Sequence, residues 1–157
     1  MKFKVIELKN IIESDLTNIT NIIANHCSKS SMVLHLNGVL GAGKTTFVRA
    51  FLANLGYKGR VKSPTYSLIE TYEIKDKNIT VSHLDLYRLS RVDELYNLGI
   101  DDYIHSNSVM LIEWPGHGGE LTPIADIAIT INVISSELRS LVIKTKDLDV
   151  YRKLKQI

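Results

Sequence analysis

The sequence has a single cysteine, Cys27, among 157 residues. One thiol cannot form an internal disulfide, and it offers no second ligand for a zinc cluster or partner for a redox pair. No run of residues approaches the ~18 apolar positions that a membrane-spanning helix needs. Residues 1–7 mix charges into their apolar positions, unlike the apolar middle of a signal peptide. We therefore expect a soluble protein of the cytoplasm.

An excess of charge of either sign is also missing. Nineteen Lys and Arg residues against 17 Asp and Glu residues leave a net charge of +2. Nucleic-acid-binding proteins usually carry a dense basic face, so direct RNA binding is not indicated. The hydrophobic and charged fractions, 45% and 23%, are ordinary for a folded domain. Without repeats, low-complexity tracts or Pro/Gly-rich linkers, the length predicts one domain.

Hydrophobic periodicity predicts an alternation of strands and helices. Short apolar runs such as 32–36 and 109–112 are typical of buried strands, whereas residues 44–55 repeat their apolar positions at helical spacing. Ser14 is the expected N-cap of a helix over 15–27. The other predictions are strands over 3–8, 67–74, 79–85, 126–133 and 138–144, and helices over 93–98 and 148–154. This order predicts a single α/β domain with a mixed β-sheet flanked by helices, as in P-loop NTPases.

One stretch carries a specific chemical signal. The motif G-x-x-x-x-G-K-[ST] matches residues 38–45, GVLGAGKT, after an apolar run and before a helical pattern. Glycines allow backbone N–H groups to surround a phosphate, and the start of the helix adds its positive dipole. Lys44 is expected to contact the β- and γ-phosphates, and the Thr45 hydroxyl to bind Mg²⁺. A glycine-rich turn that matches by chance is the alternative, which the flanking pattern disfavours.

Acids that follow apolar strands supply the second signal. Glu113 follows 109–112 directly, and Asp85 ends 79–85, so either can hold Mg²⁺ or remain a solvated strand-end acid. Residues 63–66, Ser-Pro-Thr-Tyr, form either a γ-phosphate sensor or a simple tight turn. His83 alternates with apolar positions and is expected to pack or hydrogen-bond within the sheet. Three arginines are possible phosphate contacts between which the sequence does not choose: Arg88, Arg91 and Arg139.

Taken in order, these segments resemble the bacterial TsaE (YjeE) ATPases. The resemblance runs from about residue 34 to residue 115 and is carried by LNG at 36–38, LGAGKTTF at 40–47, VKSPTY at 61–66, HLDLYRL at 83–89 and IEWP at 112–115. It implies a P-loop protein that binds ATP and Mg²⁺ and hydrolyses ATP weakly. It also implies work with the TsaD–TsaB pair, which makes threonylcarbamoyladenosine at position 37 of tRNAs that read codons beginning with A.

The resemblance also implies site residues. Its magnesium positions fall on Thr45 and Glu113, Asp85 takes a role in metal organisation or hydrolysis, and Thr65 lies in a mobile loop that faces the γ-phosphate. With Lys44, the residues Thr65, Asp85 and Glu113 form the expected catalytic set. The residues expected to bind nucleotide are Gly38, Leu40, Gly41, Ala42, Gly43, Lys44, Thr45, Thr46, Ser14 and Arg139.

The sequence departs from the family pattern in two places, and Glu13, Ser14 and Thr17 are all possible where the family often has an acidic residue or Thr near the adenine. Val39 stands where the family usually has Asp or Glu, which predicts weaker hydrolysis, and residues 135–139 replace a Gly-Arg pair of the late hairpin. Two other functions use the same loop. A small-molecule kinase would need an acceptor site and a lid, for which only 88–91 is available. A GTP-dependent switch would need an Asn-Lys-x-Asp motif, which the sequence lacks.

Overall fold

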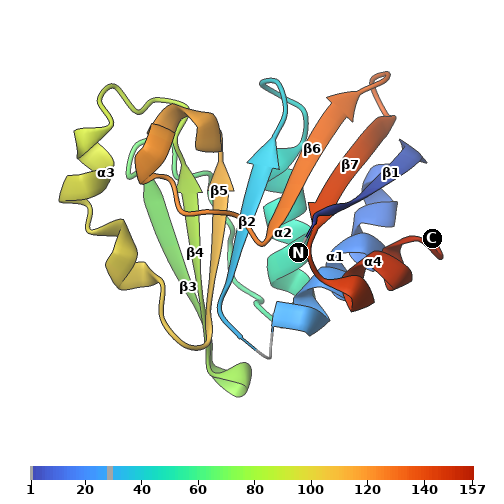
Figure 1. The fold of residues 1–157 in the computed structure, drawn as a ribbon, viewed down its shortest axis with the longest axis horizontal. Coiled ribbons are helices and arrows are strands. Elements are labelled where there is room, and N and C mark those ends of the chain that lie inside the picture. Colours follow the sequence, from blue (N-terminus) through green and yellow to red (C-terminus); the bar gives the residue numbers. More distant parts are fainter. Residues whose placement is uncertain (1, 28–29) are drawn as a thin grey trace.

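A computed structural model describes residues 2–27 and 30–157, and its frame is one mixed sheet of seven strands in the order β1-β7-β6-β2-β5-β4-β3 (Figure 1). The strands are β1 (Lys4–Ile11), β2 (Met32–Asn37), β3 (Ile69–Ile74), β4 (Ile79–Asp85), β5 (Ser108–Glu113), β6 (Ile127–Val133) and β7 (Arg139–Thr145). The helices are α1 (Leu16–Cys27), α2 (Lys44–Asn54), α3 (Asp93–Asn97) and α4 (Leu148–Leu154). The predicted fold class is confirmed.

The four central strands, β4, β5, β2 and β6, run parallel to one another. The outer strands β3, β7 and β1 pair antiparallel. Because the central strands are parallel, their carboxyl ends meet at one edge of the sheet. In open α/β sheets this edge is where ligands bind.

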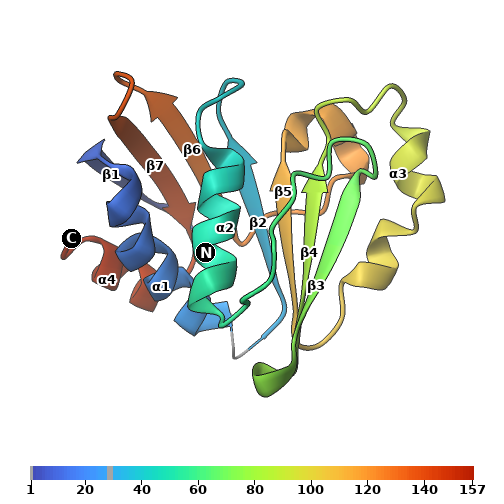
Figure 2. The ribbon, with the colours of Figure 1, turned by 180° about the vertical axis from the view of Figure 1, so that it is seen from behind.

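Two apolar cores lie on opposite faces of the sheet. One face packs α1, α2 and α4 against the strands, with Phe47 and Phe51 of α2 fully buried. The other face packs the α3 region around Leu95, with Met110 and Ile112 of β5. Figure 2 shows α2 crossing in front of the central strands on its face of the sheet. Because side chains alternate along a strand, odd-numbered residues of β4 and β5 face α2.

The start of the first helix differs from the prediction. Ser14 is not an N-cap, because it lies inside a 3-10 turn, Glu13–Asp15, that precedes α1. Ile12 is the N-cap residue of this turn, and Asp15, its third residue, accepts a hydrogen bond on Oδ2 from the Ile12 backbone N–H at 2.9 Å. The sequence has several polar residues in a row here. The path by which the chain enters the turn decides which of them accepts a hydrogen bond from the backbone.

The other elements were predicted to within a few residues. The first strand extends to Ile11, three residues beyond its predicted end, and β3 begins at Ile69 rather than at 67. The 3-10 turn Lys75–Lys77 lies in the polar turn expected between the strands over 67–74 and 79–85, whereas the 3-10 turns Ile100–Tyr103 and η4 (Pro115–Leu121) were not predicted. Among the residues that the structure describes, no helix is long and apolar enough to span a bilayer.

Candidate functional site

The glycine-rich loop, residues 38–45, connects the carboxyl end of β2 to the first turn of α2. Its turns depend on positive φ angles at Gly38 (152°), Gly41 (77°) and Gly43 (109°), which side-chain-bearing residues adopt only with strain. Gly43 occupies the N-cap position and provides no side-chain cap. The first backbone N–H groups of α2 therefore have no side-chain acceptor from the N-cap residue. A bound anion, such as a phosphate, could accept their hydrogen bonds.

Gly38→Ala is expected to lower the melting temperature more than Gly41→Ala. A Cβ at Gly38 would lie 2.8 Å from the Ile131 carbonyl oxygen, whereas a Cβ at Gly41 meets no atom within 4 Å. Both changes strain the backbone, but only the first adds overpacking of about 1–3 kcal/mol. Each kcal/mol corresponds to roughly 2–4 °C in a domain of this size. Thermal unfolding of both variants checks this, and equal melting temperatures would contradict it.

Lys44 lies buried at the base of the loop. Its Nζ donates hydrogen bonds to the Gly38 carbonyl at 2.7 Å and the Val39 carbonyl at 3.0 Å. It also lies 4.3 Å from the centre of the Trp114 ring. Burial lowers the pKa of Lys44, while the charges of Glu113 and Asp85 act in the opposite direction. An anion bound at the loop would, like these two carboxylates, stabilise the charged form of Lys44.

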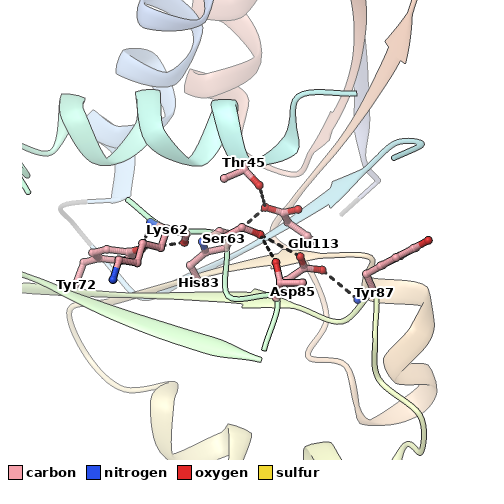
Figure 3. Close-up of polar contacts among 9 residues, drawn as sticks. Thr45, Lys62, Ser63, Tyr72, His83, Asp85, Tyr87 and Glu113 are labelled. Atoms are coloured by element: carbon pink, nitrogen blue, oxygen red, sulfur yellow. Dashed lines mark hydrogen bonds and ion pairs between the residues drawn. The ribbon is translucent and has the colours of Figure 1, made fainter. Parts of the chain in front are cut away.

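The two strand-end acids lie side by side. Asp85 and Glu113 are partners in the register of β4 and β5, and both side chains are largely buried. The Thr45 hydroxyl donates to Glu113 Oε1 at 3.0 Å, and the Tyr87 backbone N–H donates to Asp85 Oδ1 at 3.0 Å. Figure 3 shows these groups converging beneath the start of α2. The sequence predicted both acids at strand ends, and the sheet order makes them neighbours.

The loop over 63–66 closes one side of this arrangement. The Ser63 hydroxyl lies 3.4 Å from Asp85 Oδ2, and the Thr65 hydroxyl donates to Ser63 Oγ at 3.1 Å. All four predicted catalytic residues thus border one cavity of about 390 Å³, the acidic cavity. Its lining consists of Leu40, Gly41, Gly43, Lys44, Thr45, Thr46, Ser63, Thr65, Asp85, Tyr87, Arg88, Glu113 and Trp114.

A second cavity, of about 440 Å³, lies across the glycine-rich loop from the acids. This hairpin cavity is bordered by the chain before α1 and by the β6–β7 hairpin, and its lining includes Glu13, Ser14, Ala42, Gly43, Thr46, Glu137 and Arg139. Gly43 and Thr46 line both cavities. Ser14 and Arg139 therefore lie apart from the acids, and Gly38 lines neither of these two cavities.

Arg139 holds the loop from behind. Its Nε donates to the Ala42 carbonyl at 2.8 Å, and its Nη1 donates to the carbonyls of Ser135 and Leu138. A guanidinium directed at three backbone carbonyls supports the loop and the hairpin. Of the other candidate arginines, Arg88 lines the acidic cavity, whereas Arg91 pairs with Asp93 at 2.8 Å on the surface.

Three aromatic rings, two of which line the acidic cavity, were not predicted as a group. Trp114 has a left-handed backbone, with φ of 55°, and its ring centre lies 4.9 Å from that of Tyr87. The His117 ring stacks on Tyr87 and lies tilted against Trp114, and its Nδ1 donates to the Leu86 carbonyl at 3.0 Å. In the sequence, Trp114 directly follows Glu113 and His117 lies between two glycines, and neither position indicates which rings lie beside it. Both depend on η4 folding back over β5, for which the sequence has no local signal.

The donors of the acidic cavity suit a hard cation. A hydroxyl and two carboxylates, from Thr45, Glu113 and Asp85, are oxygen ligands, which Mg²⁺ prefers. Within residues 2–27 and 30–157 no cluster of three or more His, Cys, Asp or Glu residues could enclose a metal alone. Mg²⁺ typically keeps waters and shares its shell with substrate phosphates, so such an incomplete protein shell fits it.

Comparison with known proteins shows the family of this chain. A sequence model of the family described as threonylcarbamoyl adenosine biosynthesis protein TsaE matches residues 12–141. The chain belongs to the TsaE family. The family takes part in making threonylcarbamoyladenosine in tRNA, as its description and the names of its relatives state.

Relatives within the TsaE family cover different shares of the chain. The protein from Haemophilus influenzae is 50% identical over 107 residues, which are 68% of this chain and 66% of the relative. The protein from Bacillus subtilis is 44% identical over 55% of this chain and 52% of its own length. These two matches therefore span about half to two thirds of the relatives' lengths. A relative from Rickettsia bellii is 34% identical over 81% of this chain and 86% of its own.

A solved TsaE-like structure extends the likeness to nearly the whole fold. The crystal structure of YdiB from Bacillus subtilis superposes with a TM-score of 0.75 at 25% sequence identity. The superposition covers 99% of this chain and 95% of that protein. The overall fold of this chain is therefore one already seen in a crystal.

Proposed function

We propose that this chain binds ATP together with Mg²⁺ and hydrolyses it slowly. The turnover would serve threonylcarbamoyladenosine modification at position 37 of tRNAs that read codons beginning with A, in concert with the TsaD–TsaB pair. The observation that carries the proposal is the meeting of Lys44, Thr45, Asp85 and Glu113 in one cavity at the start of α2. A cation, a hydroxyl and two carboxylates at a helix N-terminus match the needs of a bound triphosphate and its metal.

Nucleotide binding divides between the two cavities. The backbone N–H groups of the loop and the Lys44 ammonium would hold the phosphates on the acidic side. The hairpin cavity, which shares Gly43 and Thr46 with the acidic cavity, would receive the nucleoside. Lys44 now donates to the Gly38 and Val39 carbonyls, so phosphate oxygens would replace these acceptors. Arg139 would act indirectly, by holding the Ala42 carbonyl and so the shape of the loop.

The acids divide their work according to their partners. The Thr45 hydroxyl and the Glu113 carboxylate, now hydrogen-bonded to each other, would hold Mg²⁺, and Asp85 would stand close enough to act through water. When bound, Mg²⁺ would neutralise charge on the phosphates. Asp85 is fixed by the Tyr87 N–H and the Ser63 hydroxyl, and this orients its carboxylate for positioning an attacking water.

We expect slow ATP turnover by the isolated protein because the tip of the glycine-rich loop carries no acidic side chain. Val39 and Leu40 are 63% and 70% exposed, so the tip presents apolar side chains to solvent. Val39 stands where the family usually has an acid, and it brings no charge to a water or a partner. The phosphate cradle is made of backbone and is unaffected by this change. We therefore expect binding to persist and hydrolysis to depend on the partner.

The loop over 63–66 provides a route from nucleotide to partner. Thr65 borders the acidic cavity, while its neighbour Tyr66 is 88% exposed and stacks against Arg88 at 4.9 Å. Ordering of Thr65 against the γ-phosphate would therefore move an exposed tyrosine–arginine pair. Loops that order around a γ-phosphate and relax after hydrolysis are a common form of switch.

ATP hydrolysis by the protein alone and with a purified TsaD–TsaB pair from the same cell tests the proposal. We expect low turnover alone and a clear, Mg²⁺-dependent increase with the pair. Partner affinity should also differ between ATP, ADP and no nucleotide. An ATP turnover rate that is the same with and without the TsaD–TsaB pair would contradict the proposal. So would a partner affinity that is equal with ATP, with ADP and without nucleotide.

The same assay addresses a small-molecule kinase, the alternative that shares this loop. Of the arginines that such a lid would use, Arg88 lines the acidic cavity but Arg91 is engaged by Asp93. Labelled γ-phosphate should therefore appear as inorganic phosphate. Label recovered on a small acceptor would favour the kinase.

A further inference from the structure

His83 lies fully buried in β4, beneath the acidic cavity. Its Nε2 is 2.8 Å from Glu113 Oε1, and this contact joins the central strands β4 and β5 (Figure 3). The sequence predicted a hydrogen bond within the sheet for this residue but not its partner. That partner is the carboxylate proposed to hold Mg²⁺.

The tautomer of His83 follows from its surroundings. A carboxylate only accepts hydrogen bonds, so Nε2 must carry the hydrogen and donate it. Nδ1 is buried and has no hydrogen-bond partner among the described residues. The reverse tautomer would point a lone pair at the carboxylate and leave a buried N–H without an acceptor, which is costly. The His83 ring therefore donates one hydrogen bond, from Nε2 to Glu113.

Both hydrogen bonds to Glu113 fall on the same oxygen. Thr45 Oγ1 and His83 Nε2 each donate to Oε1, and within the described part of the chain no hydrogen bond falls on Oε2. One oxygen is thus anchored from two sides. The carboxylate plane is fixed, and Oε2 is left to another ligand.

We propose that His83 is a positioning residue that orients the Glu113 carboxylate for Mg²⁺. The inference rests on the proposed function, since it concerns the metal that accompanies the nucleotide. Carboxylates that bind metals are themselves hydrogen-bonded, and loss of such an outer partner typically weakens metal affinity by about 10–100-fold. In this chain the outer partner is buried, so water cannot replace the lost donor.

Three substitutions separate hydrogen bonding from packing. His83→Gln places an amide nitrogen about where Nε2 lies, His83→Asn has an amide too short to reach Glu113, and His83→Leu has no donor. Ser82→Ala is the matched control, because Ser82 Oγ is also buried in β4 without a partner but faces away from α2. Mn²⁺ replaces Mg²⁺ as the probe, with its affinity measured by electron paramagnetic resonance in the presence of ADP.

We expect His83→Leu and His83→Asn to weaken Mn²⁺ binding by roughly 10-fold or more, and His83→Gln to stay within about threefold of the parent. Ser82→Ala should match the parent, and metal-free ADP affinity should be the same in all variants. The fluorescence of Trp114, the only tryptophan in the chain, gives a second readout when Mg²⁺ is titrated into the ADP complex. Thermal unfolding identifies variants that do not fold.

Parent-like Mn²⁺ affinity in His83→Leu would overturn the inference, as would equal losses in folded His83→Gln and His83→Asn. If His83→Leu does not fold, the comparison of Gln with Asn decides alone. Failure of the parent protein to bind Mn²⁺ with nucleotide would overturn the proposed function and this inference together. Failure of the inference alone therefore leaves a different signature.

Discussion

Replacing Lys44 with alanine is expected to weaken ATP binding by at least about 100-fold. A hydrogen bond to a charged group contributes about 1.5–3 kcal/mol, and the ammonium would make more than one to the phosphates. Each 1.4 kcal/mol corresponds to a factor of about ten in affinity. Lys44 is also a buried cation, and its ammonium contacts the loop and feels the charges of both strand-end acids.

Isothermal titration calorimetry with ATP and Mg²⁺ measures this loss directly. Lys58→Ala is the matched control, because Lys58 is exposed and borders neither cavity. It removes the same charge and should leave the affinity unchanged. Thermal unfolding must accompany both variants, since Lys44 also bonds the Gly38 and Val39 carbonyls. Unchanged ATP affinity in folded Lys44→Ala would rule out the glycine-rich loop as the phosphate site.

Glu113→Gln is expected to reduce Mg²⁺-dependent ATP turnover by roughly 100-fold or more. This corresponds to a loss of about 3 kcal/mol of transition-state stabilisation. The amide keeps the shape of the side chain and its contact with the Thr45 hydroxyl. It removes the negative charge that a hard cation requires of its ligand. Nucleotide binding without metal should change far less, because the loop backbone and Lys44 remain.

Turnover measured against Mg²⁺ concentration, in the presence of the TsaD–TsaB pair, checks this second effect. Glu120→Gln makes the same chemical change at an exposed position of η4 and should leave turnover intact. A Glu113→Gln variant that reached the parent rate at the same Mg²⁺ concentration would show that Glu113 is a structural acid. The division of labour with Asp85 would then have to be revised.

Much of the fold could be predicted because its signals are local. The apolar runs of β2 and β5 and the helical spacing of α2 are each contained within a dozen residues. Helix capping was less predictable, because Glu13, Ser14 and Asp15 all have suitable side chains and only the entry path of the chain selects Asp15. The 3-10 turns have no periodic pattern at all, and η4 went unpredicted for that reason.

In the site, too, features that depend on neighbouring residues could be predicted, whereas contacts between distant segments could not. Glycines, lysine and threonine of the loop are adjacent in sequence, and the acids follow apolar strands. The partner of His83, by contrast, depends on β4 lying next to β5 in register, which no segment encodes alone. Arg139 was predicted to bind nucleotide, and its contact with the Ala42 carbonyl, 97 positions away in sequence, could not be predicted from either segment. The aromatic group around Trp114 likewise forms only after η4 folds back.

The pairing of β1 with β7 has a consequence for how the chain reaches its native state. Residues 4–11 lie against residues 139–145, so the first strand has no partner until β7 has left the ribosome. Closing so long a loop is entropically unfavourable and slow, and sheets built on distant pairings fold late. We therefore expect β1 to join the sheet late, and until it does the free edge of β7 is open to pairing with another chain.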